Sequence, residues 1–188
     1  MSWSDTTITS QRLALRPFTA ADADEAFACI TPTLTRYLSF EPASTPAEFE
    51  AVWRGWLPEI AAGTDFNFTL RERTSGRFTG LLGLHRARDA EPELGIWIRE
   101  DVHGQGYGRE AVAALAAWAR ATFAPQSLRY PVAEPNTASR RIAQGLGGVE
   151  VERQSLSKYV LVVYRIPGVA TSGVAAPWTR PSHASGTA

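Results

Sequence analysis

HGQGYGREA, residues 103–111, places three glycines at alternate positions between a predicted strand and a predicted helix. Glycine lets the main chain turn tightly and approach a ligand without interference from a Cβ atom. The amides that follow point along the start of the helix, where the positive end of the helix dipole favours a phosphate or pyrophosphate. A plain connection between a strand and a helix needs fewer glycines. The stretch therefore favours an anion-binding turn.

Two nucleotide-binding motifs do not fit this turn. A P-loop requires a lysine followed by serine or threonine, and residues 103–111 contain no lysine. A dinucleotide fingerprint requires a third glycine three residues after Gly106, where Arg109 stands. That fingerprint also lies near the start of its domain, whereas this turn follows several predicted strands. Neither nucleotide class is predicted.

The chain before the turn alternates in a way that is typical of strands. Thr19 caps a predicted short helix over 20–25, and a longer helix is predicted between the Thr45 cap and Gly63. The predicted strands of this part cover residues 8–18, 66–70, 78–84 and 91–99. The second and third of them are separated by a Thr-Ser-Gly turn and read as a hairpin.

The chain after the turn alternates between helices and strands. Alanine-rich composition predicts a helix over 110–123, and a second helix is predicted over 137–146. The predicted strands of this part cover residues 128–132, 149–151 and 159–166. Because hairpins come first and helices alternate with strands later, we expect an α/β (α+β) fold with a mixed sheet flanked by helices.

Composition narrows the class of protein further. The 188 residues suit one domain over residues 1–166, and small residues and prolines over 167–188 predict a flexible or disordered tail. Nineteen basic and nineteen acidic residues give no net charge, which argues against a nucleic-acid partner. One cysteine and three histidines predict no disulfide and no metal site. Without a signal sequence or a membrane-spanning segment, we expect a cytoplasmic protein with no membrane partner.

Several stretches resemble the GNAT superfamily of N-acetyltransferases. Residues 103–108 fall on the family's glycine turn, which runs Arg or Gln, two variable residues, Gly, one variable residue, then Gly or Ala. Residues 93–98 (ELGIWI) and 136–139 (NTAS) resemble a strand and a later helix start of the Rim-type branch, which includes acetylases of ribosomal-protein N-termini. Residues 9–17 have the character of that branch's opening. The resemblance covers roughly residues 8–166, with its elements in the family's order.

The resemblance implies a mostly antiparallel sheet, with acetyl-CoA in a cleft opened by the fourth and fifth predicted strands. It implies acetyl transfer to a primary amine, either a protein N-terminus or a small molecule, by direct attack in a ternary complex. It also implies binding of acetyl-CoA as co-substrate, without a metal. The implied cofactor-binding residues are Ile96, Trp97, Ile98, His103, Gly104, Gln105, Gly106, Tyr107, Gly108, Arg109 and Asn136.

Two residues are catalytic candidates. Main-chain amides of the strand over 93–98 would polarise the thioester carbonyl if the sheet splays there. Glu93, beside that strand, would draw a proton from the amine; its alternative is a solvated acid or an ion pair. The resemblance to the Rim-type branch implies that Ser139 faces the thiol end of the cofactor and meets the departing sulfur; its alternative is a helix-start residue that satisfies a main-chain amide.

The sequence departs from the family at three positions. His103 replaces the usual Arg or Gln, and an imidazole carries only part of a charge at neutral pH. Ala143 stands where many members have a tyrosine that acts as general acid, and Gly148 replaces an apolar aromatic residue. Of the other reactive residues, His85 lies on an apolar strand and is interpreted as core or half-buried rather than as a base. Cys29 is interpreted as a small buried hydrophobe.

Two other functions stay open. One is an acyl-CoA-binding sensor or partner module without turnover, which the alanine at position 143 motivates. The other is a transferase that uses a different acyl group, such as succinyl. A homodimer is possible by analogy with the family.

Overall fold

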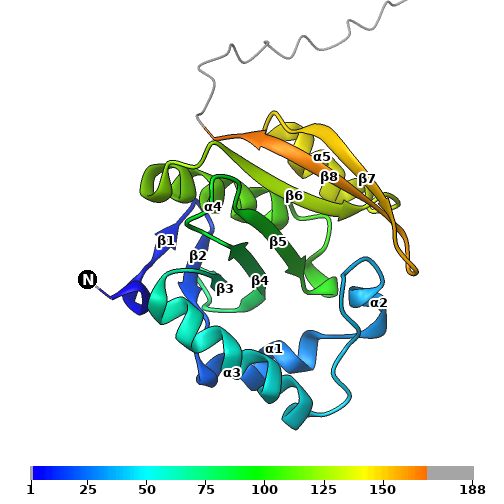
Figure 1. The fold of residues 1–188 in the computed structure, drawn as a ribbon. Helices are drawn as coiled ribbons and strands as arrows, with labels where there is room; N and C mark the ends of the chain where they lie inside the picture. Colours follow the sequence, from blue (N-terminus) through cyan, green and yellow to red (C-terminus); the bar gives the residue numbers. More distant parts are fainter. Residues whose placement is uncertain (1, 169–188) are drawn as a thin grey trace, which may run out of the picture.

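The computed structural model describes residues 2–168 (Figure 1). Within these residues, eight strands form one sheet in the order β1-β2-β3-β4-β5-β6-β8-β7. Neighbouring strands are antiparallel except β5 and β6, which are parallel. The predicted class, a mixed and mostly antiparallel sheet flanked by helices, is confirmed.

The strands are β1 (Ile8–Thr9), β2 (Leu13–Pro17), β3 (Phe66–Glu72), β4 (Phe78–His85), β5 (Glu93–Ile98), β6 (Ser127–Ala133), β7 (Val149–Ser155) and β8 (Val160–Pro167). The α-helices are α1 (Ala23–Cys29), α2 (Pro32–Thr35), α3 (Pro46–Ala62), α4 (Tyr107–Phe123) and α5 (Thr137–Gly145). Single-turn 3-10 helices cover Trp3–Asp5, Ala20–Asp22 and Glu100–Val102.

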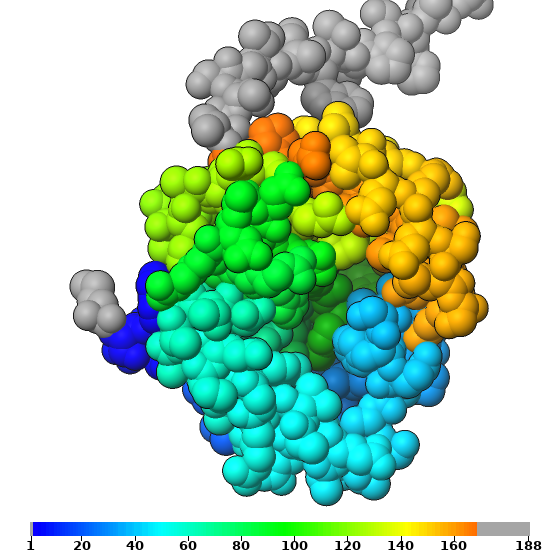
Figure 2. Space-filling model, in the orientation of Figure 1, coloured from blue at the N-terminus to red at the C-terminus, as the bar shows by residue number. Residues whose placement is uncertain are grey.

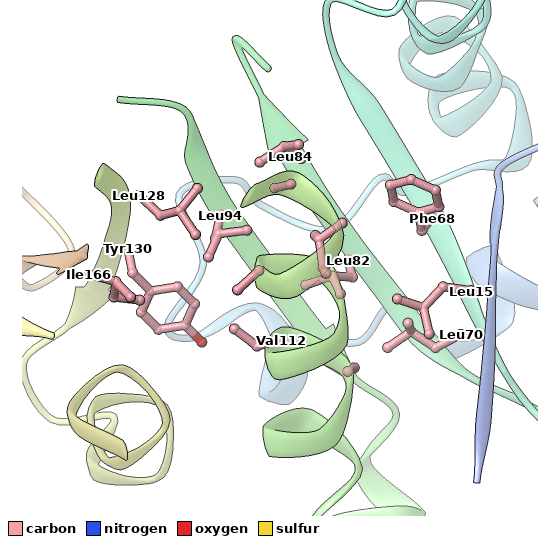
Figure 3. Close-up of a cluster of buried hydrophobic side chains, with 14 of the residues drawn as sticks. Leu15, Phe68, Leu70, Leu82, Leu84, Leu94, Val112, Leu128, Tyr130 and Ile166 are labelled. Carbon is pink, nitrogen blue, oxygen red and sulfur yellow. The ribbon is translucent and has the colours of Figure 1, made fainter. Parts of the chain in front are cut away.

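Two hydrophobic clusters cover the two faces of the sheet. On one face, α4 lies across the strands, and Val112 packs among Leu82, Leu94 and Tyr130, all of them buried (Figure 3). On the other face, α1 and α3 cover the sheet with a second cluster, which contains Phe49 of α3. Along β4 from Leu81 onward and along β5, side chains alternate between these faces, so Leu82 and Leu94 lie on the α4 side and Leu81 and Trp97 on the α3 side.

The predicted ends of α3 are confirmed. Thr45 Oγ1 accepts the N–H of Glu48 at 3.2 Å, and Gly63 ends the helix with φ 69°, a conformation that glycine adopts readily. Pro58 lies inside the helix without ending it. These local signals were sufficient because both ends are set by residues within three or four positions of each other.

The single opening strand predicted over 8–18 is instead two strands, β1 and β2, joined by a turn. The cause is Glu110 on α4, whose carboxylate accepts the Ser10 hydroxyl at 2.7 Å and the Arg12 N–H at 2.6 Å. These partners are about a hundred residues away in the sequence. The alternation of apolar residues therefore continues through a turn that only the tertiary contact imposes.

Two helix boundaries differ from the sequence prediction. The short helix α2 was not predicted, because four residues are too few to show a helical period; Thr31 caps it by accepting the Leu34 N–H at 3.0 Å. Helix α4 begins at Tyr107 rather than at residue 110. Pro167 is the last residue of β8, and the predicted tail from residue 169 onward lies outside the described residues. Within residues 2–168, no helix is both long enough and apolar enough to cross a membrane.

Candidate active site

The sheet opens between β5 and β6, the fourth and fifth predicted strands. They share one bridge, Glu93 opposite Arg129, where the Arg129 N–H donates to the Pro92 carbonyl at 2.9 Å. Beyond it the strands diverge (Figure 1), and a cleft of about 640 Å³ lies between them. Figure 2 shows the hollow between the strands, the α2 region and the β7–β8 hairpin. The sheet therefore splays where the resemblance implied it.

The register of β5 decides which of its main-chain groups face this cleft. The Arg99 N–H donates to the Thr79 carbonyl at 2.9 Å, toward β4, whereas the Pro92 carbonyl bonds to β6. Because these directions alternate along a strand, the main-chain groups of Ile96 and Ile98 point toward the opening. Those of Trp97 point toward β4, and its side chain packs edge-on against Phe78, with ring centroids 5.7 Å apart.

The glycine turn leads directly into α4. Gly104 and Gly106 have φ of 78° and 81°, in the region that favours glycine, and Gly106 is the N-cap residue. No side chain of the described residues caps this end, so the first amides of α4 stay available to an anion. Gly108 lets α4 approach both α5 and β5 closely, because a Cβ there would lie 3.3 Å from Ile142 and 3.6 Å from Ile98.

Arg12 holds the turn in place from the other end of the chain. Its Nη1 donates to the Gln105 carbonyl at 3.0 Å, and its guanidinium lies 4.5 Å from the centre of the Tyr107 ring. Glu110 pairs with Arg12 at 2.7 Å. Sequence reasoning missed this role, although Arg12 lies within the opening that resembles the Rim-type branch.

The other residues of the turn that were predicted to bind the cofactor make different contacts. His103 Nε2 lies 2.7 Å from the Ile98 carbonyl, which only accepts, so this nitrogen donates and ties the turn to the end of β5. The Tyr107 hydroxyl donates to Glu72 at 2.8 Å, and this bond raises the pKa of Tyr107. The Tyr107 side chain is therefore buried and has a structural role, and only its main chain faces the turn. The side chains of Gln105 and Arg109 are exposed.

Asn136 and Ser139 lie on the other wall of the cleft, at the start of α5. Asn136 Oδ1 caps the helix by accepting the Ser139 N–H at 3.1 Å. Ser139 Oγ lies 2.8 Å from the hydroxyl of Tyr130, and both residues line the cleft. Burial raises the pKa of Tyr130 to about 12, so the phenol keeps its proton. Tyr130 was not singled out from the sequence, because nothing local connects it to Ser139.

The structure explains two of the departures from the family. Ala143 is fully buried and has no hydroxyl, so position 143 supplies no proton donor. Gly148 donates its N–H to the Ala143 carbonyl at 2.9 Å, and a Cβ on Gly148 would lie 2.7 Å from the same oxygen. A larger residue does not fit this approach, which accounts for the glycine.

The end of the cleft near the β5–β6 bridge is both polar and aromatic. Glu93 pairs with Arg86 at 3.1 Å, and its side chain is 29% exposed. His85 is half-buried, as expected, but it lines the cleft instead of packing in the core. The other side chains at this end come from several elements and include Asn67, Phe49, Val52, Trp56 and Leu81.

Neither a nucleophilic cysteine nor a metal site fits the described residues. Cys29 packs against the α1–α3 cluster, and burial raises the pKa of its thiol, which disfavours the nucleophilic thiolate. Within residues 2–168, no group of three metal-ligating side chains is arranged to hold an ion.

A family model described as an acetyltransferase (GNAT) domain matches residues 12–149. No curated protein matches the chain. A structure from Vibrio cholerae, named as a candidate ribosomal-protein-serine acetyltransferase, is 23% identical with a TM-score of 0.74, over 89% of this chain and 99% of that one. RimL, a ribosomal L7/L12 alpha-N-protein acetyltransferase in complex with coenzyme A, is 15% identical with a TM-score of 0.77, over 86% and 98%. A GNAT-family acetyltransferase from Bacillus anthracis is 16% identical with a TM-score of 0.73, over 87% and 99%.

Proposed function

Because the chain belongs to the acetyltransferase (GNAT) family and is an acyltransferase, we propose that it moves an acetyl group from acetyl-CoA to a primary amine. The amine attacks the thioester directly while both substrates are bound. The acceptor is the N-terminus of a protein or a small-molecule amine, as the resemblance to the Rim-type branch implied.

One observation carries this proposal: the open edge of β5 and the uncapped start of α4 follow each other along the chain. The main-chain groups of Ile96 and the N–H of Ile98 face the open side of β5, and the turn at Gly104 and Gly106, which follows in the chain, offers main-chain amides; the Ile98 carbonyl is bonded to His103. A ligand that fits both has an amide-bearing arm for a strand edge and a diphosphate for a helix start. Coenzyme A has this chemistry, and the thioester on acetyl-CoA supplies an activated acyl group.

The residues on the two walls supply the remaining chemistry. The N–H of Ile96 faces the cleft and polarises the thioester carbonyl. Ser139 donates a proton to the sulfur as the carbon–sulfur bond breaks, and Tyr130 holds the Ser139 hydroxyl in place from behind. The amine must lose a proton before or during attack, and Glu93 and His85 are the two groups at that end that accept one.

The acceptor is supported by the shape and the lining of the cleft and by the named activity of one neighbour. RimL acts on the α-amino group of a ribosomal protein. The cleft of this chain opens to the surface beside α2 and the β7–β8 hairpin, which leaves room for a chain end (Figure 2). A cytoplasmic location and a homodimer stay predictions from the sequence.

The test is a thiol-release assay with acetyl-CoA and a panel of amines that contains peptide N-termini, amino acids and polyamines. Release of coenzyme A that depends on an amine, with an acetylated product of the expected mass, supports the proposal. Tight binding of acetyl-CoA by calorimetry, without thiol release for any amine, would instead support the sensor module. Faster transfer from succinyl-CoA than from acetyl-CoA would contradict the acyl group proposed here.

A further inference from the structure

His85 occupies a defined place at the acceptor end of the cleft. It is the last residue of β4 and lies directly opposite Glu93 of β5. Its side chain faces the α3 side of the sheet, as does that of Leu81, and Gly83 lies between them on the same face of β4. Gly83 is paired across the sheet with Asn67 of β3 on one side and with Gly95 of β5 on the other.

Two glycines leave space for the imidazole ring. A Cβ at Gly83 would lie 2.5 Å from His85 Nε2, and one at Gly95 would lie 3.7 Å from it. The ring therefore lies along β4, with Nε2 above the Gly83–Gly95 pair. Neither glycine has a positive φ, so the backbone does not require glycine at these positions. At Gly83, glycine is required because an added Cβ would collide with the His85 ring.

Asp65 fixes the other side of the ring. Its Oδ1 lies 3.5 Å from His85 Nδ1 and also accepts the Arg86 N–H at 3.0 Å. Arg86 has a backbone φ of 52°, which residues other than glycine rarely adopt. Backbone strain of this kind is concentrated at functional sites. A carboxylate on this side of the ring favours the tautomer with its proton on Nδ1, which presents Nε2 as an acceptor.

The surroundings favour His85 over Glu93 as the proton acceptor. Arg86 pairs with the Glu93 carboxylate at 3.1 Å, whereas His85 Nε2 has no hydrogen-bond partner among the described residues. The charged side chains beside His85 are Asp65, Arg86 and Glu93; farther along the cleft, Arg129 and Glu152 pair with each other at 2.7 Å.

The same end of the cleft carries a polar group that is free to bind an acceptor. Asn67 is 9% exposed and lines the cleft, and its side chain forms no hydrogen bond with any described residue. The α3 side chains that line the cleft, Phe49, Val52 and Trp56, are apolar. They give this end of the cleft an apolar wall, while the His85 side chain stays 40% exposed and within reach of an amine.

We infer that His85, oriented by Asp65, is the catalytic base for the amine. This rests on the proposed function. The substrate ammonium gives one proton to Nε2, and Asp65 balances the imidazolium charge. The lone pair freed on nitrogen forms the bond to the carbonyl carbon, the carbon–sulfur bond breaks, and Ser139 protonates the sulfur. The Ser139 oxygen then takes up the second proton that leaves the acetylated nitrogen. The proton on His85 then passes to solvent.

The first experiment compares His85→Gln, Asp65→Asn and Glu93→Gln by the pH dependence of kcat/KM for the best amine. His85→Gln is expected to lose about a hundredfold in kcat/KM near neutral pH and to regain activity as pH rises, because more of the amine is then neutral. Asp65→Asn is expected to lose less and to shift the acidic limb of the profile. The affinity for coenzyme A and the thermal midpoint are expected to stay at wild-type values in each variant.

A second pair of variants tests the space over the glycines without removing the histidine. Gly83→Ala places a methyl group against Nε2, so it is expected to cause a loss similar to that of His85→Gln. Gly55→Ala is the matched control, because Gly55 is exposed on α3 and a Cβ there would have no neighbour within 4 Å. It is expected to keep wild-type kcat and KM.

Two results would overturn the inference in different ways. If the wild-type protein turns over and His85→Gln keeps the acidic limb while Glu93→Gln loses it, the base is Glu93 and the proposed function stands. If the wild-type protein acetylates no amine although it binds coenzyme A, the proposed function fails, and this inference fails with it.

Discussion

Tyr130 on β6 and Ser139 on α5 share a hydrogen bond of 2.8 Å between their hydroxyl groups, in the wall of the open cleft. If Ser139 served only as a helix-start residue, its hydroxyl would accept a hydrogen bond from a main-chain amide. Asn136 already fills that role by accepting the Ser139 N–H. The Ser139 hydroxyl is thereby left to point between Tyr130 and the cleft, where a departing sulfur would need a proton.

Tyr130→Phe tests this arrangement in turnover. Without the phenol, the Ser139 hydroxyl loses the partner that positions it, so kcat is expected to fall about tenfold, with KM for acetyl-CoA nearly unchanged. Ser139→Ala is expected to lose more, because it removes the donor itself. Steady-state kinetics at saturating amine measures both. Equal kcat for Tyr130→Phe and wild type would show that Tyr130 has no positioning role.

The same tyrosine predicts a pH dependence of stability. Burial raises its pKa from 10.0 to about 12, so the folded state holds this proton more tightly than the unfolded chain does. The stabilisation is complete below pH 10 and is lost as pH rises from 10 through 12. The free energy of unfolding should fall by about 2–3 kcal/mol more in wild type than in Tyr130→Phe across this interval. Urea unfolding at several pH values measures the difference; parallel curves would contradict it.

Gly106→Val tests the anion-binding turn. At φ 81° a β-branched side chain is strained, and it would intrude on the path of the diphosphate, so binding of coenzyme A should be abolished in calorimetry. Gly76→Val is the matched control, because Gly76 has φ 73° and no atom within 4 Å of an added Cβ. It carries the same strain in the β3–β4 turn. Unchanged affinity in Gly106→Val would remove the diphosphate from this turn.

Arg12→Ala tests how the turn is held. Arg12 bonds the Gln105 carbonyl and packs on Tyr107, so its loss should loosen the turn and weaken binding of coenzyme A about fivefold. The arginine is 43% exposed, which keeps the expected effect small. Arg54→Ala, which removes an exposed pair with Glu50 on α3, is expected to leave the affinity unchanged. If both variants bind equally well, the turn holds its shape without Arg12.

Lys158→Ala tests one side of the acceptor opening. Lys158 is the sole lysine of the chain; its Nζ donates to the Thr35 carbonyl at 2.9 Å and pairs with Glu41 at 2.8 Å. It thus joins the tip of the β7–β8 hairpin to the α2 region. Its loss should raise the KM for the amine several-fold and speed hydrogen exchange in residues 36–43, because these contacts hold that wall. The affinity for coenzyme A should not change, and a change there without any in amine KM would contradict this reading.

Sequence reasoning succeeded where the deciding residues are close together in the chain. Three glycines in six residues defined the turn before α4, and Thr45, Pro46 and Gly63 defined the ends of α3. It failed at the opening strand, because Glu110 creates the turn at Ser10 from about a hundred residues away. It could not show the surroundings of His85, because an apolar strand gives no sign that Asp65 and two glycines lie around the ring.

By itself, the sequence determined the fold class, the glycine turn and the order of the elements, since hydrophobic period, capping and glycine conformation act over a few residues. Only the tertiary structure decided which side chains meet in the cleft. His85 faces Asp65 and Glu93, and Ser139 faces Tyr130, because strand register and the splay of β5 from β6 bring them together. Register depends on the packing of the whole sheet against its helices, which no local stretch contains.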